Sequence, residues 1–573
     1  MNLPGPDAKD KMRYELPLLR NTQGQGQDRL KIELELKIGF TTHTILGADV
    51  KNLELCARSY GFAGRLDFFV HDDKAKGGKQ QDDVYADFIK DDLIQVKLTV
   101  RAIFPDHAID DGAAPLTVKG LVTDKAFSII PHRKAQEAPG LVHRYTIRFV
   151  DPAQHLWQQH FPCVLYTNKT LKDVIDAQKS DKIAIDYKWA ELTKQRPLIF
   201  LGHEPGAGQA SFYDFVLWLV DTNGAALFYD YRAQKLVFDE ELPAMPHSTN
   251  LYHEDIREFH VVFPEVARHK VKVLNSYTES PATKEIDSDS KEAPLHQDYL
   301  LATPVSAQVT ARETLEKSRL RPRTKAELLA LWSRFPADPI VPGDVVELKA
   351  DIWSKAGKTL PKPVSGSKMR VREVRFAAQA TDQGPDADHG LAHTMYHVQG
   401  ALHLAAKDDK HIQLPPHIQP TYPRHIEGKI VSETGADDEL TYQIYTDKNT
   451  SVEQYKIKVP LWENQEIFVP FNPNLFPGHY FYPAYKNQRV LVAVDFDRAW
   501  LKRYLDWRPE GRLATDTQGD HILVGKKPSS STSVKHVYGE DKPEFQILRT
   551  HEKDVQTIHI KEGYMLIEVK EKK

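Results

Sequence analysis

The chain has little cysteine and no long apolar run. Cys56 and Cys163 are the two cysteines among 573 residues, too few for a disulfide framework, and we expect both to be small buried apolar residues in a reducing compartment. No stretch approaches the roughly 18 consecutive apolar residues that a membrane-spanning helix needs, which predicts a soluble protein. Residues 1–28 are polar and lack the apolar core of a secretory signal, so we expect no export by the general route.

The sequence also lacks an excess of positive charge and the common catalytic motifs. Its 76 Lys and Arg stand against 80 Asp and Glu, giving a net charge of −4, which argues against electrostatic binding to nucleic acid or an anionic membrane. There is no His-Glu-x-x-His, no Gly-x-Ser-x-Gly and no Gly-x-x-x-x-Gly-Lys motif. We therefore expect no enzyme: the sequence predicts no catalytic residue, no cofactor and no metal site.

Three polar or glycine-rich stretches were considered as sites and are interpreted as loops. Seven histidines fall between residues 389 and 425, but no cysteine and no regular histidine pairing accompanies them, so exposed linker histidines are expected rather than a metal site. They are His389, His393, His397, His403, His411, His417 and His425. Asp287-Ser-Asp-Ser290 lacks the Gly and distal Glu of a calcium loop. Gly202 to Gly208 lacks the last glycine of a dinucleotide fingerprint and should precede a helix.

Alternating apolar residues dominate the first 150 positions. Leu30, Ile32, Leu34, Leu36 and Ile38 alternate with polar residues, as expected for a β-strand with one buried face. Similar strands are predicted at 66–70, 94–103, 116–122 and 145–150. The stretch from Asp72 to Asp92 is polar and is expected to be a long exposed loop.

Helical spacing appears in three later segments. Short helices are predicted at 169–178 and 211–220, and Asn223-Gly224 has the turn chemistry of a hairpin that continues into a strand at 226–231. The strongest helical pattern runs from Ala311 to Phe335. It is interrupted near Arg321-Pro322, and Thr324 could cap a second helix over 326–335.

Short strands return in the last third of the chain. Between Ile426 and Trp507, period-two spacing and turns rich in Pro, Gly and Asn predict a closed five-stranded barrel of the OB type. Beyond it, His521 to Gly525, a Ser-rich stretch at 528–533, and strands at 554–561 and 564–569 follow. Met565, Ile567 and Val569 alternate in strands that have little to bury against within one chain, which favours an intertwined β-prism or β-helix made by several chains.

The order of these pieces resembles VgrG proteins, the spikes of type VI secretion systems, which are related to phage tail hubs and spikes. The similarity rests on Gly428 to Val431, Lys458 to Trp462, Pro477 to Pro483 and Gln488 to Val494. It extends to Leu156-Trp157, the helix after Lys169 and the aromatic helix after Ser211. Within the stretch from Phe476 to Phe496 the match is most specific.

The resemblance implies the domain plan. We expect a mainly β protein with a flexible N-terminus (1–28), hub β-barrel 1 (29–150), hub barrel 2 with helical insertions (151–378), a linker (379–425), an OB-fold domain (426–510) and a C-terminal β-stem (511–573). The chain departs from the family in lacking the long regular needle repeat, which favours a separate tip-capping protein.

The resemblance also implies a function and partners. We expect a homotrimer at the tip of a hexameric inner tube, in contact with baseplate proteins, a tip-capping PAAR-like protein and effector cargo. It would assemble in the bacterial cytoplasm and be exported by sheath contraction to puncture a target envelope. A phage or prophage tail hub is the alternative. Alternatives of other classes are an OB-fold protein that binds single-stranded nucleic acid and a cryptic cell-wall hydrolase.

Overall fold

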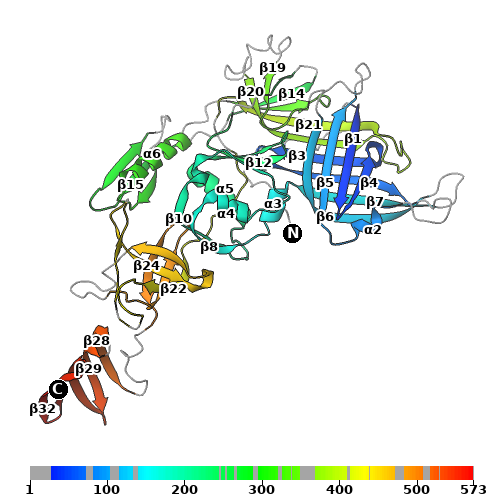
Figure 1. Cartoon of the computed structure of the whole chain (residues 1–573). Helices are drawn as coiled ribbons and strands as arrows, with labels where there is room; N and C mark the ends of the chain where they lie inside the picture. Colours follow the sequence, from blue (N-terminus) through cyan, green and yellow to red (C-terminus); the bar gives the residue numbers. More distant parts are fainter. Residues whose placement is uncertain are drawn as a thin grey trace. The chain divides into compact units, whose positions relative to one another are not determined.

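The computed structural model confirms a mainly β protein (Figure 1). It describes residues 27–72, 82–103, 115–132, 140–243, 247–251, 255–263, 268–287, 295–320, 326–336, 339–348, 368–409, 413–437, 439, 441–448, 450–470, 483–506, 517–527 and 529–571. Unit 1 contains residues 1–161, 178–192 and 205–420, and unit 2 contains residues 162–177, 193–204 and 421–573. The loop expected at Pro477 to Pro483 lies largely outside the described residues.

Eight antiparallel strands of unit 1 pair in a closed ring, because each hydrogen-bonds to the next and the last returns to the first. In ring order they are β1 (Gln27–Ile38), β5 (Ile94–Ala102), β6 (Leu116–His132), β7 (Gly140–Val150), β4 (Gly61–His71), β3 (Val50–Arg58), β20 (Lys368–Ala380) and β21 (His393–Ala406). Strand β2 (Thr41–Leu46) also pairs with β1, and the 3-10 helix η2 (Gly47–Asp49) follows it.

The interior of the ring is filled by the alternating residues that the sequence predicted. Leu30, Ile32, Leu34 and Leu36 are all 0% exposed. The segment 82–92, expected as an exposed loop, instead forms the helix α2 (Tyr85–Phe88) and buries Phe88 edge-on against Tyr145. For residues 82–92 that interpretation was wrong, because a few apolar side chains in a polar stretch reach the core; residues 73–81 of the expected loop lie outside the described residues.

Strands β20 and β21 extend beyond the ring and pair there with further strands of the same 13-stranded sheet. The first residues of β20 pair with β19 (Val345–Leu348), whereas residues 373–379 pair with β3. Likewise, β21 pairs first with β1 and then with β18 (Glu327–Trp332). The two ends of this sheet are β13 (Ser248–Leu251), beside β19, and β14 (Ile256–Val262), beside β18. Residues 379–425, expected as a linker, therefore contain β21, one of the strands of the ring.

Gly400 marks the place where β21 changes partner. A Cβ at this position would lie 1.9 Å from the ring of Trp332, at the end of β18. Strand β18 itself corrects a prediction, since residues 326–335 were expected to be helical. All six β18 residues are buried between β14 and β21, so burial on both faces overrides the helical preference of Leu and Ala.

Smaller elements complete unit 1. A three-stranded sheet consists of β11 (Ala226–Asp230), β12 (Lys235–Asp239) and β9 (Ile185–Tyr187), with helices α3 (Pro152–Trp157) and α5 (Phe212–Asn223). Another sheet, β16 (Ala282–Ile286), β15 (His269–Asn275) and β17 (Leu295–Leu301), packs against α6 (Ser306–Leu320). Asn223-Gly224 ends α5 instead of forming the hairpin turn, because Gly224 adopts the left-handed conformation of a helix C-cap.

Unit 2 contains the short strands predicted between Ile426 and Trp507, paired in a six-stranded sheet. Its pairing order is β25 (Gln465–Pro470), β24 (Glu453–Val459), β22 (Arg424–Val431), β26 (Arg489–Val494) and β27 (Ala499–Tyr504), with β23 (Tyr445–Thr446) beside β24. The 3-10 helix η4 (Pro460–Trp462) joins β24 to β25, and another, η3 (Ala190–Thr193), precedes β10. Strands β8 (Cys163–Thr170) and β10 (Gln195–Gly202), joined through α4 (Leu171–Ala177), add Leu165, Leu198 and Phe200 to the same core. These strands were expected in hub barrel 2.

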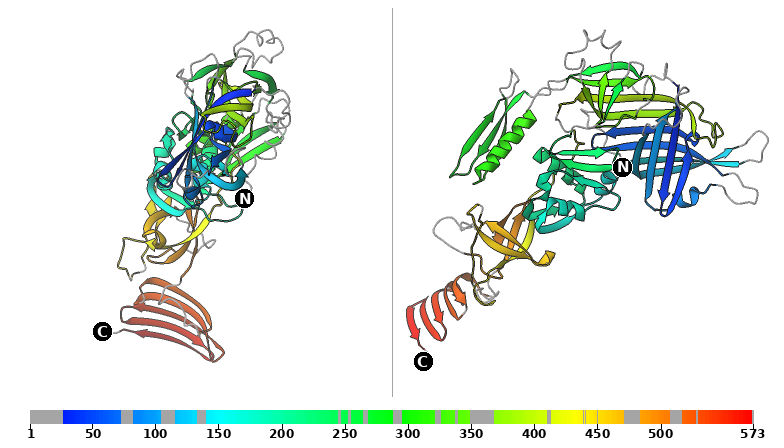
Figure 2. Two further views of the ribbon diagram at one scale, coloured as in Figure 1. Left: turned by 90° about the vertical axis from the view of Figure 1, so that its right-hand side faces the viewer. Right: turned by 45° about the horizontal axis from the view of Figure 1, so that its top comes forward.

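The last five strands form one antiparallel sheet in which each strand pairs with the next (Figure 2). They are β28 (Gly519–Lys527), β29 (Ser530–Gly539), β30 (Lys542–His551), β31 (Asp554–Lys561) and β32 (Tyr564–Lys570). The Ser-rich stretch at 528–533 leads directly into β29. We call this sheet, residues 519–570, the stem sheet.

Candidate functional site

The residues considered for metal binding from the sequence do not gather into a site. Within the described ranges, no group of three or more His, Cys, Asp or Glu side chains is placed to hold a metal ion. His389 Nδ1 lies 2.8 Å from Asp49 Oδ1, and His403 Nε2 lies 2.9 Å from Glu327 Oε2. His403 is buried, so the expectation of an exposed linker histidine is wrong there, because β21 is an internal strand. His411 and residues 288–290 lie outside the described residues.

Two other predictions about isolated residues have mixed outcomes. Cys56 is half-buried on β3, where its Sγ donates to Glu373 Oε1 at 3.4 Å, and Cys163 is exposed on β8. Neither is fully buried, contrary to expectation. Residues 203–208 form the predicted loop before α5, whose N-cap is Ser211. No helix among the residues that the structure describes is long and apolar enough to cross a membrane.

The most unusual surface is one face of the stem sheet. Successive strands place an apolar residue directly opposite the next, producing a row that crosses the whole sheet. The members of this apolar row are Ile522, Val534, Ile547, Ile558 and Ile567. Met565 and Val569 lie two residues to either side on β32 and therefore point to the same face.

This apolar face has no cover within its own sheet. Ile522 is 48% exposed, Met565 is 62% exposed and Ile567 is 65% exposed. Ser533 is the one buried residue among those described in the sheet, and its position between Leu523 and Leu548 places it on the opposite face. Exposed apolar surfaces of this extent are typical of places where another molecule binds.

The opposite face is predominantly polar and carries ion pairs. Glu544 Oε1 accepts a hydrogen bond from Lys561 Nζ at 3.1 Å, and Glu544 Oε2 lies 3.1 Å from His559 Nε2. The hydrogen bond from Lys561, with His559 next, lowers the pKa of the Glu544 carboxyl. The two faces of the stem sheet therefore differ in polarity. The face with the ion pairs is polar, and the face with the apolar row is hydrophobic.

Sequence reasoning found the alternation on β32 but missed the row across five strands. The alternation of each strand was available as a signal. Which residues lie opposite one another depends on the register between neighbouring strands. The turns, such as the one at Glu562-Gly563, set this register, and the alternation within a single strand does not show it.

The comparisons agree with this architecture at low sequence identity. No protein-family model matches the chain, and no curated protein matches it. A chain in the half-lidded Francisella PdpA–VgrG complex aligns with a TM-score of 0.69 and 14% identity, over 99% of this chain and 92% of that one. For the lidless PdpA–VgrG complex the TM-score is 0.68 and the identity 14%, over 96% and 99% of the two chains.

A looser likeness is to the 43 kDa tail protein of prophage MuSo2 from Shewanella oneidensis, with a TM-score of 0.41, 13% identity, and coverage of 66% of this chain and 100% of that one. The similarity to the PdpA–VgrG complexes extends over nearly the whole chain. It confirms, at the level of fold, the resemblance to VgrG-like spike proteins that the sequence predicted.

Proposed function

We propose that this protein is the trimeric hub and spike of a contractile injection machine of the type VI secretion kind. The observation that carries the proposal is the uncovered apolar row of the stem sheet, Ile522, Val534, Ile547, Ile558 and Ile567, in a chain whose fold is similar to that of a PdpA–VgrG complex chain. Three stem sheets placed with these faces inward would bury all three rows together. Such an intertwined stem supplies the interior that one sheet lacks.

The other parts of the chain suit the same role. The strand order β25-β24-β22-β26-β27 supports the proposal of an OB-type domain, which would form a ring above the stem in a trimer. The ring, together with the strands β13, β19, β18 and β14 that extend the same sheet beyond it, would let three chains present six surfaces to a hexameric inner tube. Baseplate proteins, a tip-capping PAAR-like protein and effectors are the further partners that this role needs.

In this proposal the chain does no chemistry. The protein assembles in the bacterial cytoplasm, and sheath contraction elsewhere supplies the energy that drives the spike through a target envelope. The interfaces between the three subunits must then withstand the force of contraction. An obligate oligomer of this kind hides more than about 2,000 Å² at an interface.

Native mass measured by light scattering at several concentrations tests the proposal. The expected result is a value near three times the 65.3 kDa chain mass that does not change on dilution. A mass of one chain at every concentration, both alone and with a PAAR-like protein, contradicts it. A trimer should also appear in electron micrographs as an elongated particle with one narrow end.

A further inference from the structure

A small cavity lies in unit 1 where segments that are far apart in the sequence meet. Its volume is 30 Å³, which exceeds the roughly 10–15 Å³ that one water-sized group needs. The lining comes from Ser59 after β3, from β11, from residues 242–243 and 342–343, from β20 and from Gln413. We call it the arginine cavity, because Arg370 and Arg372 of β20 line it.

Three polar side-chain atoms of residues that line the arginine cavity have no hydrogen-bond partner among the described residues. They are Arg370 Nε, Ser59 Oγ and Gln413 Oε1, and all three are shielded from bulk water. Buried polar atoms in proteins nearly always have a partner, and a buried polar atom without one destabilises the fold. The concentration of three such atoms around one cavity of this size indicates that a polar group binds there.

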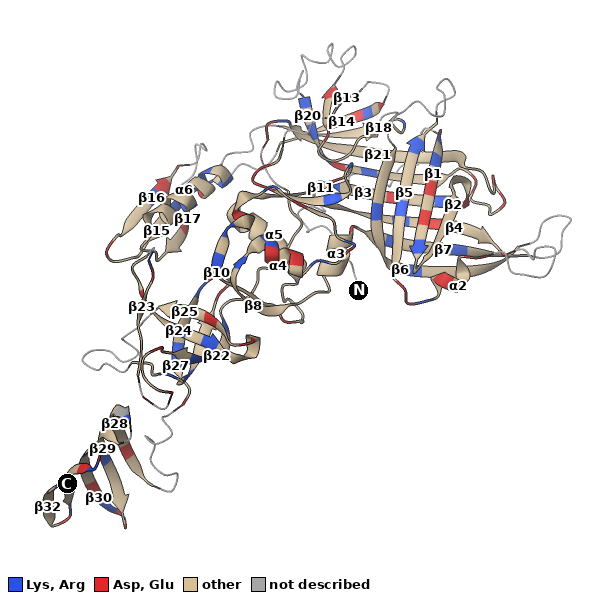
Figure 3. Ribbon diagram, viewed as in Figure 1, with Lys and Arg blue, Asp and Glu red and all other residues tan. Residues whose placement is uncertain are grey.

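Arg370 forms no ion pair with a carboxylate of a described residue. Its Nη1 donates to the Pro243 carbonyl at 2.9 Å, and its Nη2 donates to the Lys407 carbonyl at 3.5 Å. The nearby carboxylate of Asp409 is paired with Arg372 instead, at 2.8 Å. Lys and Arg recur along β20, where Figure 3 draws them blue. Burial first, and then the like charge of Arg372, lowers the pKa of the Arg370 guanidinium, so its surroundings disfavour the cation.

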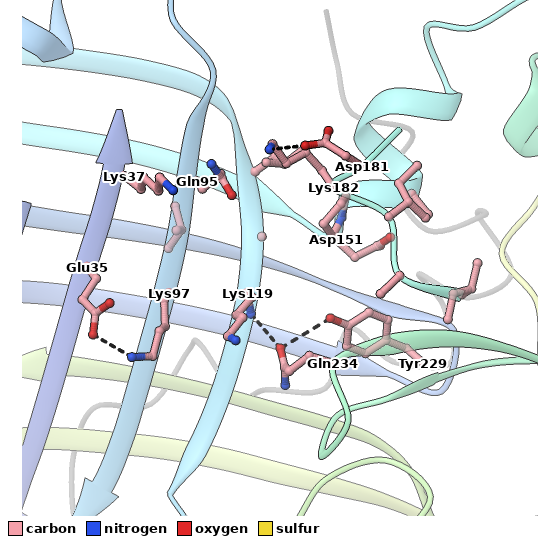
Figure 4. Close-up of a pocket in the computed structure, with 18 of the residues that line it drawn as sticks. Glu35, Lys37, Gln95, Lys97, Lys119, Asp151, Asp181, Lys182, Tyr229 and Gln234 are labelled. Atoms are coloured by element: carbon pink, nitrogen blue, oxygen red, sulfur yellow. Dashed lines mark hydrogen bonds and ion pairs between the residues drawn. The ribbon is translucent and has the colours of Figure 1, made fainter. Parts of the chain in front are cut away.

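A larger hollow of 490 Å³ shares Tyr229 with the arginine cavity and lies outside β1, β5 and β6 (Figure 4). The lysines of that hollow reach solvent, and two of them are paired there. Lys97 lies 2.6 Å from Glu35, and Lys182 lies 2.6 Å from Asp181. Water and salt screen such exposed charges. The two arginines of the arginine cavity are only 6% and 7% exposed, so their charges are screened far less.

The size and the chemistry of the arginine cavity favour a monatomic anion. Sulfate, phosphate and organic acids are larger than the single water-sized group for which 30 Å³ has room. Arg370 Nε–H and the Ser59 hydroxyl can both donate to an anion. The Gln413 amide is placed with its oxygen unpartnered, and a half-turn of the amide would offer its NH2 group as a third donor. No carboxylate of a described residue lines the cavity.

We propose that the arginine cavity binds one chloride ion, which accepts hydrogen bonds from Arg370 Nε and Ser59 Oγ and neutralises Arg370. The ion joins the end of β3, the strand β20 and the segment at Gln413, which are remote in the sequence, and thereby stabilises unit 1. This site does not depend on the trimer or on the proposed function, because every lining residue belongs to unit 1 of one chain.

Thermal unfolding of the full-length protein in sodium chloride and in sodium gluconate of equal ionic strength tests the site, since gluconate is too large for the cavity. Chloride should raise the melting temperature of wild-type protein by at least about 2 °C relative to gluconate, and bromide should have the same effect. Arg370→Met should lose this difference between the salts. The matched control is Lys368→Met, which removes an exposed cation of the same strand outside the cavity and should keep the difference.

The variant Gln413→Glu tests the same site through a gain of stability. Its carboxylate has nearly the shape of the amide and would take the place of the ion beside Arg370. In gluconate this variant should melt at or above the temperature of wild-type protein in chloride, and chloride should no longer raise its melting temperature. A lower melting temperature than that of wild-type protein in both salts would show that the cavity does not favour negative charge, and would overturn the proposal.

Crystals grown in sodium bromide locate the ion directly, because bromide scatters X-rays anomalously. The expected result is an anomalous peak within about 3.5 Å of Arg370 Nε in wild-type protein and no peak there in Arg370→Met. Water alone in the cavity overturns the proposal, as do equal melting temperatures of wild-type protein in chloride and gluconate. A peak in the cavity without any effect of chloride on the melting temperature would indicate an adventitious ion only, and would also overturn it.

Discussion

The ring in unit 1 and the stem sheet have the same alternating sequence pattern but opposite burial. In β1, Leu30, Ile32 and Leu34 are 0% exposed, whereas Ile522 and Ile567 in the stem sheet are 48% and 65% exposed. The ring returns to its first strand and fills its own interior. The stem sheet does not close, so its apolar face depends on something outside the sheet. Alternation thus shows which residues share a face but not what covers them.

This difference has an energetic consequence. Burying an aliphatic side chain fully contributes about 1.5–3 kcal/mol, and the ring gains this at most of its inward positions within one chain. The stem sheet recovers only part of it, since Val534, Ile547 and Ile558 are half-buried. Its stability should therefore depend on association, whereas that of the ring should not.

The largest expected effect comes from placing a charge on the apolar row. Ile558→Asp puts a carboxylate in the middle of the face that three copies would bury, and an unpaired buried charge is strongly unfavourable. We expect the native mass to fall from three chains to one at all concentrations. Light scattering measures the mass, and circular dichroism should show that unit 1 remains folded.

The matched control is Thr557→Asp, on the adjacent residue and the opposite, polar face. This variant should keep the native mass of the wild-type protein. If both variants dissociate, a general loss of β31 explains the result and the comparison between the two faces fails. If neither dissociates, the apolar row is not the interface.

The next effect concerns the closed interior. Phe68 is 0% exposed, and its ring stacks on Tyr145 with centroids 5.2 Å apart. Phe68→Ala should lower the free energy of unfolding of unit 1 by about 3–5 kcal/mol, measured by urea denaturation. Phe40→Ala, at a fully exposed turn position, should change it by less than about 0.5 kcal/mol. Equal losses would mean that the ring is not the stabilising core.

Burial also reverses the effect of pH on a carboxyl group. In the folded protein Asp151 is 1% exposed, and burial raises its pKa to about 7. Between about pH 4 and 7 the folded state holds a proton that the unfolded state releases, so this group lowers stability as pH rises to 7. Asp151→Asn should keep the cap on Gln154 N–H, and it should be more stable than wild type at pH 8, by on the order of 2 kcal/mol.

The pH profile provides its own control. At pH 5, where Asp151 is protonated, the two proteins should have the same stability within error. Glu544 of the stem sheet has the opposite shift, since the hydrogen bond from Lys561 lowers its pKa. Glu544→Gln should therefore not produce a gain at pH 8. If the difference in unfolding free energy between Asp151→Asn and wild type is the same at pH 5 and pH 8, Asp151 does not lose a proton between these pH values in the folded protein, and the prediction is wrong.

Sequence reasoning predicted the elements that depend on local periodicity. It failed where contacts with segments remote in the sequence determine the secondary structure. The strands at 30–38 and 94–103 and the helices at 171–177 and 212–223 follow from periodicity and from the Ser211 cap. Residues 326–335 were misassigned because β18 is buried between two strands that are remote in sequence. The apolar row could not be predicted, since it depends on the register between five strands.

The smallest expected effect lies in the core of unit 2, where the hairpin of β8 and β10 adds side chains to the core of the six-stranded sheet. Tyr422 donates its hydroxyl proton to the Phe200 carbonyl at 2.8 Å, and Phe200 packs with Ile457 and Val492 in that core. Tyr422→Phe removes one hydrogen bond and leaves a buried carbonyl with one partner fewer, so the free energy of unfolding of unit 2 should fall by about 1 kcal/mol. Tyr442→Phe, at a position of the same unit that is 41% exposed, should change the free energy of unfolding by less than about 0.5 kcal/mol in urea denaturation. An equal loss of unfolding free energy in both variants would contradict this prediction. It would mean that the hydrogen bond from Tyr422 to the Phe200 carbonyl stabilises unit 2 no more than the hydroxyl of an exposed tyrosine does.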